Sequence, residues 1–228
     1  LLVLFTTNMQ AQTIKQVGCG EYIAVYLKSD STVCVVNQSS PWSMPISTYA
    51  VDSIIQVTGG QYHAAGIDAQ GKAYIFNINA GVSVVSVDSF GNPFRDNRQI
   101  KCLYQSNVTI RDNDSSIWYW GVDDAMNYRG GSTIAAPIKF TPIPGSRKAK
   151  KIECVSTVGF SAATAVIVLC TDGTMWRYTR GNRVPTQLSV PETILDFTCT
   201  AHYGTIAASG TKLYSVEGGT DSRYVGTI

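Results

Sequence analysis

Two histidines are the first side chains in this sequence that could carry acid–base or metal chemistry. His63 follows the glycine pair Gly59-Gly60, and His202 lies within one residue of the equivalent place in a later sequence repeat. Neither has a metal-ligand motif or a base-orienting residue nearby. We therefore expect both histidines to be structural, with His63 hydrogen-bonded to the backbone at a sheet corner. We expect neither a metal site nor a cofactor.

Six cysteines could form disulfides in an oxidising compartment. Four of them recur at about one position of the repeat, which favours a small packed residue: Cys19, Cys102, Cys154 and Cys199. Equivalent positions in neighbouring repeats are too far apart to bridge as a rule. Pairing within a repeat stays open for Cys19 with Cys34 and for Cys154 with Cys170.

Two charged segments invite functional interpretations. Residues 112–116 read Asp-Asn-Asp-Ser-Ser and resemble the start of a calcium loop, but Ile117 and Asp123 replace the glycine and glutamate that such a loop needs. A hairpin turn explains this segment better. Residues 147–151 form the one basic run, which we interpret as a solvated connection, with contact to an acidic partner as the alternative.

Aromatic residues beside planar polar groups suit the recognition of a protein or a glycan. Such residues occur in two segments rich in proline or glycine, and they are our candidate ligand-binding residues: Trp42, Asp123, Asp124, Asn127, Tyr128 and Arg129. The alternative is that Trp42 and Tyr128 only cover sheet edges.

Catalysis has weaker support in the sequence. The motifs of zinc proteases, serine hydrolases, phosphate-binding loops and dinucleotide-binding domains are absent. The rival hypothesis is a carbohydrate-active enzyme whose fold brings two carboxylates together from among Asp52, Asp123, Glu153 and Asp196. We expect a binding protein that is not an enzyme.

Composition limits the classes of partner. Charged residues make up 15% of the chain and the net charge is +2, so the basic excess of a nucleic-acid binder is missing. No run of 18 apolar residues exists, so we expect no membrane span. Residues 1–5 are apolar and Ala11 follows a short polar stretch, which predicts the remnant of a secretory signal peptide over 1–11. The alternative for residues 1–5 is a buried first strand.

An internal repeat dominates the rest of the chain. A shift of 40 places residues 14–37 on 54–77 with seven identities, including Gln16 on Gln56 and Tyr22 on Tyr62. A shift of 140 places 54–76 on 194–216, and two weaker copies lie between. Each copy has a short apolar strand, a small-residue corner, a second strand, a polar turn and an aromatic or β-branched third strand.

This pattern predicts an all-β chain built as a β-propeller. About five four-stranded blades are visible, approximately at 14–53, 54–99, 100–151, 152–193 and 194–228 of a propeller domain over 12–228. A single blade cannot bury both faces of its sheet, so we expect neighbouring blades to cover one another. A β-sandwich is the rival fold, but it does not explain the repeat.

The repeat resembles that of the regulator of chromosome condensation family of seven-bladed propellers. Four short motifs carry the likeness: Val17-Gly18-Cys19-Gly20, Gly60-Gln61-Tyr62-His63, Thr171-Asp172-Gly173-Thr174-Met175-Trp176 and Trp118-Tyr119-Trp120-Gly121. The resemblance implies seven blades, and the secreted bacterial members of the family look like interaction modules. The family's nucleotide exchange activity does not carry over, because it depends on loop residues outside these motifs.

Together these observations predict an extracytoplasmic scaffold, whether secreted, periplasmic or on the cell surface, that presents propeller loops to a protein or glycan partner. Since seven blades are implied and five are visible, we expect residues 1–228 not to close a ring. The exposed faces of the end blades should then promote association, and we expect the natural protein to continue past residue 228.

The signal-peptide hypothesis predicts that residues 1–11 are removed on export, because a small residue follows an apolar stretch. N-terminal sequencing of the exported protein should begin at Gln12 or Thr13. A mature chain that still carries Leu4 and Phe5 would contradict the hypothesis.

Overall fold

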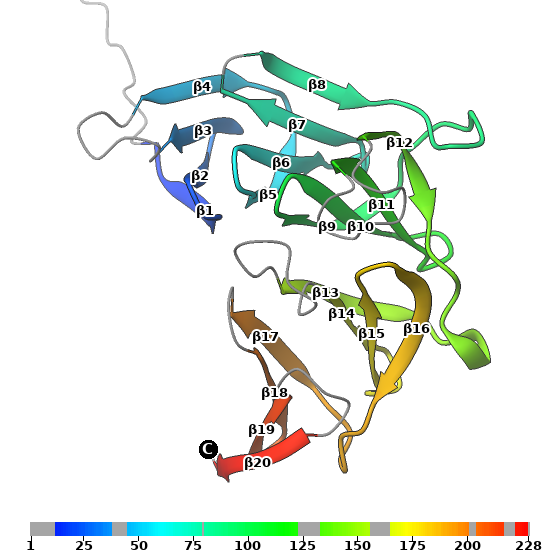
Figure 1. Ribbon diagram of the computed structural model, residues 1–228. Helices are drawn as coiled ribbons and strands as arrows, with labels where there is room; N and C mark the ends of the chain where they lie inside the picture. Colours follow the sequence, from blue (N-terminus) through cyan, green and yellow to red (C-terminus); the bar gives the residue numbers. More distant parts are fainter. Residues whose placement is uncertain are drawn as a thin grey trace, which may run out of the picture.

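The computed structural model describes residues 12–37, 45–78, 80–122, 133–155, 165–200, 204–216 and 222–227. This part of the chain forms five antiparallel sheets of four strands, each built from consecutive strands in sequence order. The sheets follow one another around an arc, with the first strand of each sheet on the inner side and the fourth on the outer side (Figure 1). The prediction of an all-β propeller with five visible four-stranded blades is confirmed.

Strand bounds reproduce the repeat. The first two blades are β1 (Ile14–Cys19), β2 (Ile23–Lys28), β3 (Thr32–Asn37), β4 (Ile46–Ala50), then β5 (Ile54–Gly59), β6 (His63–Asp68), β7 (Ala73–Asn77), β8 (Gly81–Val85). The third and fourth are β9 (Asn97–Leu103), β10 (Ser106–Arg111), β11 (Ile117–Val122), β12 (Thr133–Lys139), then β13 (Ala149–Val155), β14 (Ala165–Cys170), β15 (Met175–Thr179), β16 (Asn182–Leu188). The fifth is β17 (Asp196–Thr200), β18 (Gly204–Ser209), β19 (Lys212–Val216), β20 (Ser222–Thr227).

Burial of the second strands shows that the blades stack face to face. In the second and fourth blades, every residue of β6 and β14 is buried. In the first and fifth blades, β2 and β18 alternate between buried and half-buried residues, because a neighbour covers only one face. The apolar clusters accordingly lie between blades, and the largest joins residues of the second, third and fourth.

Hydrogen bonds at the inner strands join consecutive blades. One side chain from each of the first four inner strands reaches a backbone group of the next blade: Gln16 to Val57 N, Gln56 to Ile100 N, Gln99 to Ile152 N, each at 2.9 Å, and Lys151 to Phe197 O at 2.6 Å. These side chains satisfy backbone groups on the unpaired edge of each inner strand. We call them the inter-blade latches.

Two glycines let the corners of the first three blades approach closely. A Cβ atom on Gly20 would lie 1.8 Å from the carbonyl oxygen of Gly60, and one on Gly60 would lie 2.7 Å from the carbonyl oxygen of Tyr104. Neither distance is possible for a real Cβ, so the glycine corners of the repeat are a packing requirement.

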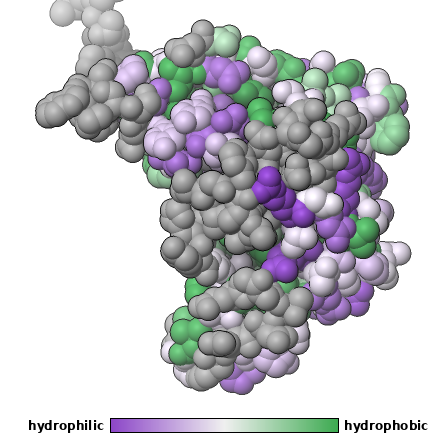
Figure 2. Space-filling model, viewed as in Figure 1, coloured by the Kyte–Doolittle hydropathy of each residue, from purple (hydrophilic) through white to green (hydrophobic). Residues whose placement is uncertain are grey.

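The two end blades each leave a face without a neighbour. Val17 and Ile46 of the first blade are 60% and 59% exposed, and Val225 of the fifth is 57% exposed. Hydrophobic residues reach the surface on the fifth blade in the space-filling view as well (Figure 2). In the described ranges, no helix is long and apolar enough to cross a membrane. Residues 1–11, the predicted signal remnant, lie outside the described residues.

The latches predict a stability difference between two glutamines. Replacing Gln99 by Ala leaves the buried N–H of Ile152 unpaired and should lower the free energy of unfolding by about 1–3 kcal/mol. Replacing the exposed Gln187 by Ala on the outer strand β16 should change it by less than about 0.5 kcal/mol. Denaturant unfolding of both variants measures the difference, and equal effects would contradict the role of the latch.

Candidate functional site

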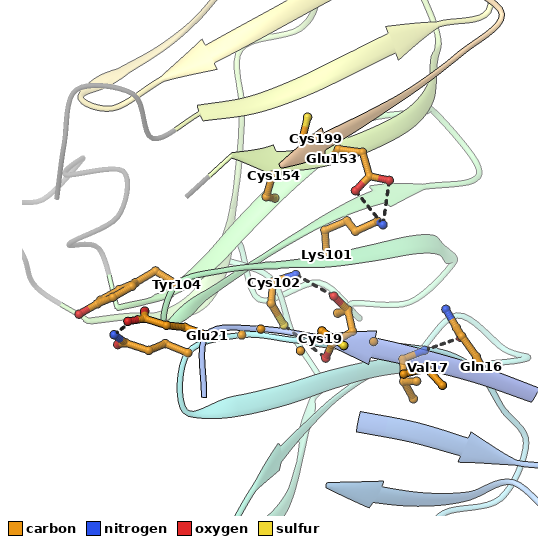
Figure 3. Close-up of a pocket in the computed structure, with 17 residues that line it drawn as sticks. Gln16, Val17, Cys19, Glu21, Lys101, Cys102, Tyr104, Glu153, Cys154 and Cys199 are labelled. Atoms are coloured by element: carbon orange, nitrogen blue, oxygen red, sulfur yellow. Dashed lines mark hydrogen bonds and ion pairs between the residues drawn. The ribbon is translucent and has the colours of Figure 1, made fainter. Parts of the chain in front are cut away.

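A cavity of about 650 Å³ lies where the inner strands converge. Residues from β1, β5, β9, β13 and β17 line it, so all five blades contribute (Figure 3). The space contains four thiols, one lysine and two glutamates, whose chemistry decides what it can do: Cys19, Cys102, Cys154, Cys199, Lys101, Glu21 and Glu153.

Three of the four thiols in this cavity, those of Cys102, Cys154 and Cys199, are unsuited to nucleophilic chemistry. Burial raises the pKa of Cys102 and of Cys199 to about 12, and it raises the pKa of Cys154 well above the usual range. A protonated thiol is a weak nucleophile and a poor metal ligand. Across the described ranges, no group of three or more His, Cys, Asp or Glu residues could hold a metal ion.

All six cysteines are free, so neither disulfide left open by the sequence forms. The strand register gives the reason. Cys154 lies opposite Val166, whereas Cys170 lies opposite Ala149 at the other end of the same strand pair. Cys34 lies on the third strand of its blade, where its thiol is 3.8 Å from the Thr48 hydroxyl, while Cys19 ends the first strand.

A line of charges follows the inner strands of the last three blades. Lys101 lies 2.8 Å from Glu153, Lys151 lies 3.9 Å from Glu153, and Lys151 lies 2.6 Å from Asp196. The hydrogen bond from Lys151 lowers the pKa of the Asp196 carboxyl. Glu153 and Asp196 are two of the four carboxylates that the sequence offered for a catalytic pair, and both are bound by lysines. Of the other two, Asp52 lies in an exposed turn before β5, and Asp123 lies outside the described residues.

His63 is buried at the start of β6, and its partner differs from the one expected. Its Nε2 lies 3.0 Å from Oδ1 of Asn107 on the neighbouring blade, and 3.7 Å from the Cys102 thiol. The sequence predicted a backbone partner at the blade's own corner, which is wrong because the ring reaches across to β10. Burial lowers the pKa of the imidazole, so the ring is neutral near pH 7. His202 lies outside the described residues.

Aromatic and amide side chains line one mouth of the cavity. The rings of Tyr22 and Tyr62 stack with centroids 5.3 Å apart. Gln61 accepts a hydrogen bond from Gln105 at 2.9 Å and donates one to Glu21 at 2.9 Å, which links three consecutive blades. We call this surface, formed by the turns at 20–22, 60–62 and 103–105, the tyrosine face.

The sequence analysis missed the tyrosine face, although a signal was present. Tyr22 and Tyr62 are identical at a shift of 40, and an aromatic residue that repeats at a turn marks a surface position. The residues proposed instead lie outside the described residues: Trp42, Asp123, Asp124, Asn127, Tyr128 and Arg129. The strands that flank them, β3 with β4 and β11 with β12, turn at the same end of the blades as the tyrosine face.

The two charged segments have structural partners. Residues 112–116 form the turn between β10 and β11, as predicted, and Asp114 accepts hydrogen bonds from Ser116 N at 2.9 Å and Lys139 Nζ at 2.8 Å. The basic run is more than a solvated connection, since its last residues begin β13. Arg147 binds Asp172 at 2.7 Å, and Lys150 donates to Leu195 O at 2.9 Å.

No protein-family model and no curated protein matches the sequence. Solved structures do match its fold. Human WBSCR16 has a TM-score of 0.67 and 11% identity over 95% of this chain and 68% of its own. Yeast RCC1 (Prp20) bound to Kap60 has a TM-score of 0.64 and 12% identity over 90% of this chain and 56% of its own.

A third neighbour is the fission yeast complex of SREBP–SCAP binding domains, with a TM-score of 0.60 and 11% identity over all of this chain and 64% of that one. The chain therefore spans less than two thirds of two of these three proteins. At such identities the likeness establishes the β-propeller fold, with the RCC1 propeller among the similar structures.

The buried imidazole predicts a pH-dependent stability difference. Because the folded-state pKa of His63 lies below its unfolded value, the unfolded chain binds the extra proton first as the pH falls. His63 therefore destabilises the fold progressively below about pH 6.5. Replacing His63 by Gln should lower the melting temperature relative to the wild-type protein at pH 7.5. At pH 5 the difference between the two melting temperatures should be smaller, because only the wild-type protein is destabilised by the buried imidazole. His63→Ala should cost about 1–2 kcal/mol at neutral pH. A difference in melting temperature that does not change with pH would contradict the conclusion that the buried ring is neutral.

Proposed function

We propose that this protein is an extracytoplasmic binding scaffold of the secreted, RCC1-like type, which holds a protein partner on the tyrosine face. The observation that carries the proposal is the stack of Tyr22 on Tyr62 above the chain of Glu21, Gln61 and Gln105. Tyrosine is enriched at protein interfaces, because its ring buries a large area at a low cost in side-chain entropy.

The tyrosine face is ordered before any partner arrives. The backbone N–H of Gln61 donates to the carbonyl oxygen of Tyr104 at 2.8 Å, which fixes one turn against the next blade. The side-chain hydrogen bonds then hold the amides in place, while Tyr62 keeps 51% of its surface exposed. A preordered surface loses less conformational entropy on binding, so more of the interaction energy is expressed as affinity.

Two fold neighbours support a protein partner by analogy. The RCC1 structure is a complex with Kap60, and the SCAP structure is a complex with SREBP domains. The enzyme alternative needs one carboxyl group with a raised pKa. The lysine contact shifts the pKa of Asp196 in the opposite direction, which weighs against that alternative. Export rests on the apolar segment over residues 1–5.

Photo-cross-linking tests the proposed surface. With a photoreactive phenylalanine in place of Tyr62, irradiation of the producing cells should give a discrete protein adduct. The matched control is the same substitution at Phe90, which is 74% exposed and lies beside Trp118 towards the opposite end of β11. Equal adducts from both positions, or adducts from Phe90 alone, would contradict the proposal. An adduct whose whole added mass is removed by glycosidases would indicate a glycan partner.

Binding should also depend on the tyrosine rings themselves. Replacing Tyr22 and Tyr62 together by Ser should weaken capture of the cross-linked partner at least tenfold, the size of effect typical of aromatic residues central to an interface. The melting temperature should fall little, because Tyr62 is half exposed.

A further inference from the structure

A second depression, separate from the axial cavity, lies between the second and third blades. It has a volume of about 380 Å³ and is bounded by the ends of β7 and β11 and the starts of β6, β10 and β12. It therefore opens at the same end of the blades as the tyrosine face, and Tyr62 and Gln105 belong to both. We call it the inter-blade groove; its other polar lining includes Asn77, Trp120 and Thr133.

Trp120, which lines this groove, has an unused hydrogen-bond donor. Its side chain is 4% exposed, and its Nε1–H has no partner among the described residues. Trp118 and Trp176 each donate to the hydroxyl two residues earlier, at Ser116 (2.7 Å) and Thr174 (3.0 Å). For Trp120 the residue two earlier is Trp118, which offers no acceptor. A buried donor without an acceptor is unfavourable and rare, so an oxygen from a ligand would relieve it.

The groove is also uncharged. Among its lining residues in the described ranges there is no Asp, Glu, Lys or Arg. Its one titratable base, His63, is occupied by Asn107 and is neutral near pH 7 because burial lowers its pKa. A charged ligand group would lose its hydration here without gaining a counter-ion. The lining therefore favours an uncharged ligand that presents oxygen acceptors.

We propose that the inter-blade groove binds an extended, uncharged, proline-containing segment of a protein partner, with one of its backbone carbonyls accepting from Trp120 Nε1. A polyproline II segment has no internal hydrogen bonds, so its carbonyl oxygens are free to accept. Its prolines bring no N–H groups that would need acceptors from the groove. The half-exposed Tyr62 at the rim offers a ring against which a prolyl ring packs. This inference rests on the proposed function and names the chemistry of the partner.

The probe that tests it is hexaproline, acetylated and amidated at its ends so that it carries no charge. Titrated into protein labelled with ¹⁵N at its tryptophans, it should shift the indole N–H resonance of Trp120 and leave that of Trp176 in place. Trp120→Phe removes the donor and keeps an aromatic ring, and it should weaken hexaproline binding at least tenfold. A glycine–serine hexapeptide with the same end groups should bind at least tenfold more weakly than hexaproline.

Trp176→Phe is the matched control, because it removes an indole whose N–H already has a partner. It should lower the melting temperature and leave hexaproline affinity unchanged, whereas Trp120→Phe should melt no lower than this control. The wild-type indole shift tests the site even if a variant folds poorly.

Several results would overturn the inference: no hexaproline binding at millimolar concentration, equal binding by the Trp120→Phe variant, or equal binding of the glycine–serine peptide. A shift of the Trp120 indole by chitohexaose with none by hexaproline would assign the groove to a glycan instead. If hexaproline fails while the cross-link from Tyr62 to a protein persists, the groove inference falls and the proposed function stands. If both fail, both fall.

Discussion

A four-stranded sheet with two apolar faces is stable only when another sheet covers each face, and this constraint underlies the whole structure. β6 and β14 are buried along their entire length because blades flank them on both sides. The clusters of buried side chains accordingly cross blade boundaries instead of lying within single blades. Each end blade has a neighbouring sheet on one face only. Apolar residues of the first blade such as Val17 and Ile46 therefore remain exposed.

Face-to-face stacking brings the inner strands together around an axis, where each has one unpaired edge. The inter-blade latches supply hydrogen-bond partners for backbone groups on this edge. The glycine corners leave room for neighbouring blades to approach each other closely. The same crowding buries the thiols of Cys102, Cys154 and Cys199 and raises their pKa values, which keeps them protonated. Charged side chains near the axis are paired with one another across blades, as Lys101 is with Glu153.

The surface that we propose for recognition lies at one end of the blades. There the turns of three consecutive blades expose tyrosines and amides, and the hydrogen bonds of Gln61 fix their positions. A scaffold of this kind separates two tasks: the stacked sheets and their glycine corners provide rigidity, and the other turn residues provide the contacts. The loop residues that the sequence proposed for binding lie outside the described ranges, so their role stays a prediction.

Local sequence patterns determined the strands of this protein. A shift of 40 places β1, β2 and β3 on β5, β6 and β7 to within a residue, because alternating apolar residues and turn-forming pairs act over a few positions. Tertiary structure alone decided the partners across blades: Asn107 for His63, 44 residues away, Tyr62 for Tyr22, and none for the indole N–H of Trp120. These outcomes depend on how far one sheet lies from the next and how it is rotated. That geometry is set by the packing of whole faces, which no short stretch of sequence encodes.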